Sequence, residues 1–274
     1  MNPPAPDGAR FLGAHSPDLL SRMEDAGLNA SAPPEQRWMD GWLVRTNPGK
    51  AQRARCINAV AEGRERWQSK LQRCEALYRR LGLPILVRIT PFTRPADLDP
   101  CLAKAGYRHH DDTRVMVLPS LDQDELRHPA APPAGTTWGA LDPDAYAQAV
   151  GAIRGSTAEA RRAHAARLRS SPVRYCGYAL FDESGVAIAC GQFAAEEDLV
   201  GLYDIATAAG YQGQGLATWL CKRLLTTAAT EAGSRSAYLQ VGADNQPARR
   251  IYDRLGFEDA YSYHYRLAPQ TSPG

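Results

Sequence analysis

Three glycines stand within six residues at the start of an apolar helical pattern, in the stretch GYQGQGLATWL from Gly210 to Leu220. From Leu216 onward a leucine recurs every four residues, which predicts a helix packed against a core. The first turn of a helix leaves backbone N–H groups unpaired and carries a partial positive charge, so it suits phosphate groups. Glycine removes the side chains that would block a close approach. We therefore predict that a pyrophosphate group binds here.

The spacing of the glycines and the residues that follow them can be compared with the known classes of phosphate-binding site. A P-loop requires a lysine and a serine or threonine directly after its last glycine, whereas Gly215 is followed by Leu216 and Ala217. A dinucleotide site requires GxGxxG early in a parallel βαβ unit, with an acidic residue about 20 residues further on. The segments before Gly210 instead predict an antiparallel meander, so neither class fits.

The elements around the glycine loop follow from periodicity. Residues 142–154 and 158–170 show helical patterns, and the second of these is rich in arginine. The β-rich runs VRYCGYALFD and VAIACGQFAA are separated by ESG, which predicts a hairpin. LVGLYDIAT, residues 199–207, predicts a third strand that leads directly into the loop.

Two motifs resemble those of the GNAT acyltransferase superfamily. Gln212-Gly213-Gln214-Gly215-Leu216-Ala217 resembles the family signature Q/R-x-x-G-x-G/A. SAYLQVGADNQPARRIYDRLGF resembles the segment V-x-x-x-N-x-x-A-x-x-x-Y-x-x-x-G-F at each marked position, namely Val241, Asn245, Ala248, Tyr252, Gly256 and Phe257. A last strand, YSYHYRL, completes a resemblance that covers residues 138–267. It implies the α+β GNAT fold, a central mostly antiparallel sheet flanked by helices.

The resemblance implies acetyl-CoA as co-substrate, because in this family the loop and the helix N-terminus hold its pyrophosphate. Backbone N–H groups at a splayed end of the third strand would polarise the thioester carbonyl. Asn245 also has a purely structural interpretation as a helix-starting residue. The residues expected to contact the cofactor are Ile205, Ala206, Thr207, Gln212, Gly213, Gln214, Gly215, Leu216, Ala217, Asn245 and Ala248.

Tyr252 is implied to face the thioester sulfur, although a tyrosine on a short amphipathic helix also fits a core position. Proton transfer from a phenol with a pKa near 10 to a thiolate near 8.5 is uphill by about 2 kcal/mol. We therefore expect Tyr252 to donate a strong hydrogen bond to the departing thiolate. Full proton transfer would require a site that shifts these values.

The acceptor amine must lose a proton. A lysine-like amine is neutral in only about one part in a thousand at pH 7.4, a handicap of about 4 kcal/mol. The family often places a glutamate eleven residues before its signature, and Gly201 stands there. Asp204 is the candidate base, although strict alternation points it to the other face unless a bulge intervenes. Glu196, Glu197 and a water chain are the alternatives.

The first half of the chain repeats this order of elements. GWLVRT and RARCINAV predict strands, RERWQSKLQRCEALYRRLG a helix, and residues 83–120 a strand, a helix and a strand. Ala105-Gly106-Tyr107 corresponds to Leu255-Gly256-Phe257, but Leu102 replaces the tyrosine and no glycine loop precedes the long helix. We interpret this half as a degenerate GNAT-like copy that binds no CoA and shapes the acceptor pocket.

The proline-rich stretch 122–137 predicts a linker between a domain at 1–125 and a catalytic domain at 136–274. The 274 residues are 44% hydrophobic and carry a net charge of +2. No apolar run approaches the roughly 18 residues of a membrane span. The N-terminus shows no secretion signal, so we expect a cytoplasmic protein. The scattered basic residues do not resemble a nucleic-acid site.

We expect no metal. The six cysteines form no CxxC pair, and adjacent histidines in HHDD, residues 109–112, point to opposite faces of a strand. The leading interpretation is an N-acetyltransferase that acts on a primary amine of a small molecule or amino-acid-like acceptor. The alternative is a non-catalytic module that binds acyl-CoA, against which Tyr252 argues. A homodimer is left open.

Overall fold

The computed structural model describes residues 8–48, 51–127 and 130–269. Within them the strands form one sheet of eleven, in the order β1-β2-β3-β4-β11-β5-β10-β9-β8-β7-β6. The first half contributes β1 (Gln36–Met39), β2 (Trp42–Arg45), β3 (Ile57–Ala59), β4 (Leu86–Ile89) and β5 (Arg108–Leu118). The second half contributes β6 (Thr137–Leu141), β7 (Tyr175–Phe181), β8 (Ala187–Glu196), β9 (Leu199–Thr207), β10 (Ser236–Gly242) and β11 (Glu258–Leu267).

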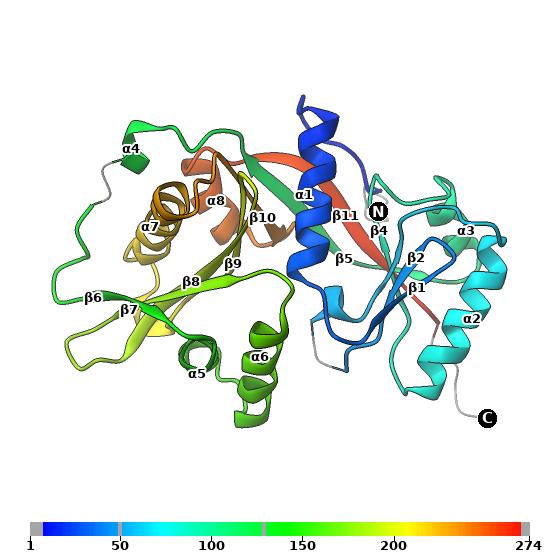
Figure 1. Ribbon diagram of the computed structural model, residues 1–274, viewed down its shortest axis with the longest axis horizontal. Helices are drawn as coiled ribbons and strands as arrows, with labels where there is room; N and C mark the ends of the chain where they lie inside the picture. The colour runs from blue at the N-terminus through cyan, green and yellow to red at the C-terminus, as the bar shows by residue number, and fades with distance from the viewer. Residues whose placement is uncertain (1–7, 49–50, 128–129, 270–274) are drawn as a thin grey trace, which may run out of the picture.

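Helices flank this sheet along its length (Figure 1). They are α1 (Pro17–Ala30), α2 (Trp67–Arg80), α3 (Leu98–Lys104), α4 (Asp124–Arg127), α5 (Pro143–Ile153), α6 (Ala158–Ser170), α7 (Leu216–Glu231) and α8 (Gln246–Arg254), with short 3-10 turns η1 (Gln52–Ala54) and η2 (Ala209–Tyr211). Ser16, Asp142 and Asn245 cap α1, α5 and α8, each with a proline in the first turn. Helix α1 is absent from the sequence prediction, although Ser16-Pro17 carries this start signal.

The two halves have the same strand order and the same pairing. In the first half, β1-β2-β3-β4-β11 pair antiparallel, antiparallel, parallel and antiparallel in turn. In the second half, β7-β8-β9-β10-β5 pair in the same succession. The predicted repeat is therefore visible in the topology.

The two halves exchange their last strands. Strand β5, from the first half, pairs with β10 of the second half, and β11 pairs with β4 of the first. The exchanged strands also pair with each other, from Glu258 opposite Val117 to Leu267 opposite Arg108. One continuous sheet results, with β5 and β11 crossing the centre of Figure 1.

The corresponding helix ends have matching turns. Gly106 and Gly256 both have φ of 85°. The next N–H donates to the carbonyl of Leu102 in the first half and of Tyr252 in the second, both at 3.0 Å. This is the arrangement of a Schellman cap, which favours glycine because its φ is positive. Leu102 thus occupies the position of Tyr252, as the sequence comparison of the halves predicts.

Alternate residues of the central strands serve two cores. Val115 and Val117 of β5 pack with α1 on one face of the sheet, whereas Met116 and Leu118 pack with α7 on the other. A third core joins α2 and α3 to β2, β3 and β4. A fourth, smaller core holds α5 and α6 against β7 and β8. Helix α1 lies across the centre of the sheet, at the junction of the halves (Figure 1).

The predicted linker, residues 122–137, includes α4 and the first residue of β6. The boundaries 1–125 and 136–274 divide the chain but not the sheet, because each half supplies a strand to the other. The boundaries themselves stay a prediction. None of the described helices combines the length and apolar character needed to cross a membrane.

The exchange of β5 and β11 predicts that a cut between the halves leaves them joined. A site-specific protease sequence inserted between Ala131 and Pro132 lies in an exposed stretch. After cleavage, the two fragments should elute together at the size of the intact chain in size-exclusion chromatography and separate only in denaturant. The parent protein without the insertion, treated with the same protease, is the control. Fragments that separate under native conditions would contradict the exchange.

Candidate active site

Strands β9 and β10 open a gap in the sheet. They pair in parallel from Leu199 opposite Ser236 to Leu202 opposite Leu239, and no further. Beyond this point β9 stays paired with β8 up to Thr207, while β10 stays paired with β5 up to Gly242. From Tyr203 onward, the edge of β9 that faces β10 therefore has no strand partner. The same holds for the edge of β10 that faces β9, from Gln240 onward. This is the splayed strand end that the sequence analysis predicts near Ile205, Ala206 and Thr207.

A β-bulge interrupts β9 at the gap. Gln192 lies opposite Tyr203 and Cys190 opposite Ala206, so Gly191 faces both Asp204 and Ile205. Asp204 has a positive φ of 54°. A Cβ on Gly191 would lie 2.6 Å from the Ile205 side chain, so the glycine leaves room for this packing. The bulge reverses the alternation of β9, and both Asp204 and Ile205 line one cavity.

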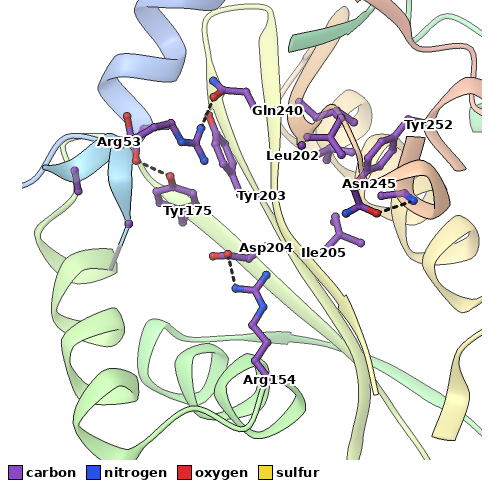
Figure 2. A pocket seen from close by; sticks show the side chains of 18 of the residues that line it. Arg53, Arg154, Tyr175, Leu202, Tyr203, Asp204, Ile205, Gln240, Asn245 and Tyr252 are labelled. Carbon is purple, nitrogen blue, oxygen red and sulfur yellow. Dashed lines mark hydrogen bonds and ion pairs between the residues drawn. The ribbon is translucent and has the colours of Figure 1, made fainter. Parts of the chain in front are cut away.

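That cavity has a volume of about 350 Å³ and is lined by both halves of the chain. Its lining includes Leu202, Asp204 and Ile205 of β9, Leu239, Gln240, Val241 and Gly242 of β10 and Asn245, Ala248 and Tyr252 of the α8 region. The remainder of its wall comes from Ala30, Ser31, Ala51, Arg53 and Ala54 of the first half and from Arg154, Arg167, Tyr175 and Tyr203 of the second. In Figure 2, Arg53, Tyr175 and Arg154 lie to one side of β9 and Tyr252 and Asn245 to the other.

Asp204 is held by several donors. Its carboxylate accepts hydrogen bonds from Arg154 Nη1 and from Gln192 Nε2, both at 2.8 Å, and lies 3.4 Å from His164 Nε2. Burial alone would raise the pKa of Asp204, but the interactions with His164 and Arg154 outweigh it and hold the pKa well below its usual range. A carboxylate of such low basicity is a weak proton acceptor. Asp204 therefore suits the positioning of Arg154 better than the role of base.

The two alternative carboxylates lie elsewhere. Glu196 and Glu197 sit at the turn between β8 and β9 and line a separate pocket beside α1. Asn29 Nδ2 donates to Glu196 at 2.9 Å, and Arg22 pairs with Glu197 at 3.4 Å. The structure brings neither of them to the gap between β9 and β10.

Tyr252 lies on α8 with its ring buried and its side chain in the wall of the cavity (Figure 2). Burial raises the pKa of its phenol well above the usual value, and nearby Cys221 adds to this effect. Its hydroxyl makes no hydrogen bond to the residues that the structure describes. A protonated phenol with a free hydroxyl at the wall is a ready hydrogen-bond donor for a ligand.

The glycine loop leaves the start of α7 open. Gly213 and Gly215 have φ of 76° and 79°, a region that other residues rarely adopt. Gly215 is the N-cap, and no described side chain caps the helix. A Cβ on either glycine would meet nothing within 4 Å. The first N–H groups of α7 are thus free to bind an anion that approaches from solvent, as the spacing predicts.

The equivalent position in the first half is filled by the protein itself. The carboxylate of Asp40 accepts the backbone N–H of Arg64 at 2.8 Å and that of Glu65 at 2.7 Å, just before α2. These bonds, led by that from Glu65, lower the pKa of Asp40. Lys70 of α2 also donates to the Asp40 carbonyl at 3.0 Å. A side-chain anion therefore occupies the place where the second half offers an open cradle.

The predicted residues fall into two groups. Asp204, Ile205, Asn245, Ala248 and Tyr252 line the same cavity, whereas the loop from Gln212 to Ala217 and the strand end at Ala206 and Thr207 lie beyond its lining. Asn245 also caps α8 by accepting from Ala248 N at 3.2 Å, so its structural role is real.

The sequence analysis does not predict the arginines of the cavity. Arg53 and Arg154 carry no motif, and Arg167 lies in the arginine-rich segment of α6 without further signal.

One group near the exchanged strands has metal-binding residue types. Ligand atoms of His109, Asp112 and His264 lie within 4.8 Å of one another. The rings of His109 and His264 are stacked, with centroids 4.2 Å apart and planes 23° apart. Stacked rings direct their in-plane nitrogen lone pairs along parallel directions, not toward a common point. Asp112 instead pairs with His109 at 2.8 Å, and Asp99 with His264 at 2.9 Å.

The model of the acetyltransferase (GNAT) family matches residues 107–257, more than half of the chain. The chain belongs to this family. Its fold and its activity as an N-acetyltransferase are thereby confirmed. The alternative of a non-catalytic module is set aside.

Known relatives and structures agree with the family. The chain is 25% identical over 239 residues to the uncharacterized N-acetyltransferase YobR of Bacillus subtilis, which covers 85% of this chain and 92% of that protein. The solved GCN5-related N-acetyltransferase from Kribbella flavida aligns with a TM-score of 0.68 and 16% identity, over 92% of this chain and 96% of that one. A tandem GNAT protein from the clavulanic acid biosynthesis pathway aligns with a TM-score of 0.59 and 16% identity, over 75% and 70% of the two chains.

The low pKa of Asp204 predicts how activity depends on pH in Asp204→Asn. Because the carboxylate stays ionised above about pH 4, the acid limb of kcat/KM should keep its position, while turnover falls about tenfold as Arg154 loses its partner. CoA release measured between about pH 5 and pH 9 tests this. Asp144→Asn, which removes the exposed ion pair between Asp144 of α5 and Arg169 of α6, is the control. Loss of the acid limb in Asp204→Asn would make Asp204 the base after all.

Proposed function

We propose that the protein transfers an acetyl group from acetyl-CoA to the primary amine of a small-molecule acceptor. The observation that supports this most is the single cavity at the gap between β9 and β10. Tyr252 and Asn245 line its wall on one side of β9, and residues of both halves line the other (Figure 2). A thioester that enters from the first side and an amine that enters from the second meet at the open edge of β9.

The start of α7 fits the pyrophosphate of the cofactor. Backbone N–H groups from Gln212 to Ala217 would bind it, because Gly213 and Gly215 leave the approach clear and no described side chain competes. Asn245 and Ala248 would contact the part of the cofactor that leads into the cavity. The first half lacks such a cradle, since the Asp40 carboxylate already accepts the N–H groups of Arg64 and Glu65 in the loop before α2. One cofactor per chain follows.

The open edge of β9 would polarise the thioester carbonyl. On the edge of β9 that has no strand partner, the backbone N–H groups near Ile205, Ala206 and Thr207 that point into the gap would stabilise the negative charge that develops on the carbonyl oxygen. The amine nitrogen forms a bond to the carbonyl carbon, and the carbon–sulfur bond breaks. The amine proton leaves through a chain of water molecules in the cavity, because Asp204 is too weak a base and Glu196 and Glu197 line another pocket.

Tyr252 would stabilise the leaving group. Its phenol stays protonated at neutral pH, since burial raises its pKa. The raised pKa also makes full proton transfer to the thiolate less favourable than in water. Tyr252 therefore donates a hydrogen bond to the sulfur in the transition state, and the thiolate takes its proton later from solvent.

The glycine loop predicts the affinity and the stoichiometry of the cofactor. Titration with acetyl-CoA should saturate at one molecule per chain. Gly213→Ala and Gly215→Ala should each weaken binding by about tenfold or more, because a left-handed residue with a side chain costs roughly 1–2 kcal/mol and the methyl group blocks the backbone.

Calorimetry on the folded variants measures both quantities. Gly210→Ala is the matched control, because Gly210 lies in the same loop, has an ordinary φ and also has open space around it. Unchanged affinity in Gly213→Ala and Gly215→Ala, or binding of two molecules per chain, would contradict this assignment.

The free hydroxyl of Tyr252 predicts the effect of Tyr252→Phe. The ring and its packing remain, so acetyl-CoA affinity should hold, while turnover falls by about 100-fold, the lower range for general acid catalysis. Single-turnover CoA release measures the change. Tyr107→Phe is the control, because its hydroxyl bonds Glu75 at 2.6 Å in the first half, away from the cavity. Equal turnover in Tyr252→Phe and the parent would leave Tyr252 a packing residue.

A further inference from the structure

The cavity contains more positive than negative charge. Its charged lining residues are Arg53, Arg154, Arg167 and Asp204. Asp204 is already paired with Arg154 at 2.8 Å and is close to His164. The guanidinium groups of Arg53 and Arg167 pair with no carboxylate among the described residues. Arginine stays charged at every physiological pH, so these two charges face the cavity without a counter-ion from the part of the chain that the structure describes.

Arg53 is fixed in place before any ligand arrives. Its Nη1 donates to Gln240 Oε1 at 2.7 Å, and the same oxygen accepts the Tyr263 hydroxyl at 2.9 Å. The guanidinium also lies 6.0 Å from the centre of the Tyr203 ring. One bond to a neutral amide leaves most of its five N–H donors free. Figure 2 shows this group at the cavity wall, directed at Gln240 and Tyr203.

A second arginine lies behind Arg53. Arg45 donates to the Arg53 carbonyl at 3.1 Å and to that of Leu28 at 2.6 Å. Burial lowers the pKa of Arg45 to about 10, and it stays charged at neutral pH. Its charge adds to the positive field of this wall, because among the described residues its guanidinium donates to neutral oxygens and to no carboxylate.

Arg167 approaches from the other half of the chain. It lies on α6, and together with Arg53 it interacts with Tyr175, whose hydroxyl donates to the Ala30 carbonyl at 2.6 Å. Tyr175 thus lies within the electrostatic reach of both arginines, and all three residues line the same cavity. Two guanidinium groups that line one cavity suit a ligand with a carboxylate or a phosphate, because arginine can bind either group with two hydrogen bonds.

We propose that the acceptor carries an acidic group, a carboxylate or a phosphate, in addition to its amine, and that Arg53 and Arg167 bind this group. The assignment rests on the proposed acetyl transfer for its reaction but not for its binding site. The acid end lies against the α1 side of the sheet, and the amine points through the gap between β9 and β10 toward Tyr252. The same charges repel polyamines and other acceptors with a second positive charge. Arg53 of the first half and Arg167 of the second thus select the acceptor together, by charge.

Paired acceptors that differ only in the acid test the proposal on the unmodified protein. The pairs are 4-aminobutyrate with 1-aminobutane, glutamate with its dimethyl ester, and O-phosphoethanolamine with ethanolamine; putrescine is the dication. The acid member should have a kcat/KM at least about tenfold higher in one class of pair, because a hydrogen bond to a charged group contributes roughly 1.5–3 kcal/mol. The pair with the larger difference in kcat/KM shows whether the site prefers a carboxylate or a phosphate. If the neutral acceptor and its acid have equal kcat/KM in every pair, the proposal is wrong.

Variants then assign the residues. Arg53→Gln and Arg167→Gln should each raise KM for the preferred acid by about 10-fold to 100-fold and leave KM for its neutral partner and for acetyl-CoA unchanged. Arg53→Lys should restore part of the loss, because it keeps the charge without the planar fork. Arg162→Gln, an exposed position on α6 outside the cavity, is the matched control. An equal loss for acid and neutral acceptors would overturn the role of these residues.

Direct binding separates this proposal from the proposed reaction. Calorimetry in the presence of CoA measures the affinity of each acid without turnover. Acid binding that Arg53→Gln and Arg167→Gln abolish, without CoA release from any amine, would support the acidic subsite and contradict the proposed transfer. CoA release with no preference for acids would support the proposed transfer and contradict the acidic subsite.

Discussion

The pairing of β5 with β11 holds the rest of the molecule together. Each of these strands ends one half of the chain, and each lies in the sheet beside a strand of the other half. The gap between β9 and β10 belongs to the second half alone, but the wall that carries Arg53 and Ala30 belongs to the first. Only a continuous sheet fixes that wall against the gap. A flexible linker between separate domains would leave the acceptor side of the cavity undefined.

Local signals allowed much of this structure to be predicted from the sequence. The glycine turns at Gly106 and Gly256, the strand–helix–strand order and the open start of α7 depend on residues close together in the chain. These features follow from periodicity and turn chemistry, which short segments determine. The family motifs placed Tyr252 in the cavity wall for the same reason.

The rest depends on contacts between distant segments. The bulge at Asp204 arises where Gly191 of the neighbouring strand admits Ile205, and no pattern within β9 reveals it. The strand exchange is invisible in the order of elements, because both halves would show that order with or without it. Arg53 and Arg167 line one cavity although they lie in different halves of the chain. When charged side chains from distant segments line one cavity, no pattern within either segment indicates it.

The carboxylate of Asp40 shows how one copy of a duplicated fold loses a ligand without losing its shape. The N–H groups of Arg64 and Glu65, in the loop before α2, already have an anion, and a covalently attached carboxylate is always present at high effective concentration. A dissolved pyrophosphate cannot match that supply. The loop is also packed closely on this residue, because a Cβ on Gly63 would lie 2.4 Å from the Asp40 carboxylate. A dissolved anion would have to displace both the carboxylate and the close packing of Gly63 against it, so this half keeps its shape without a bound ligand.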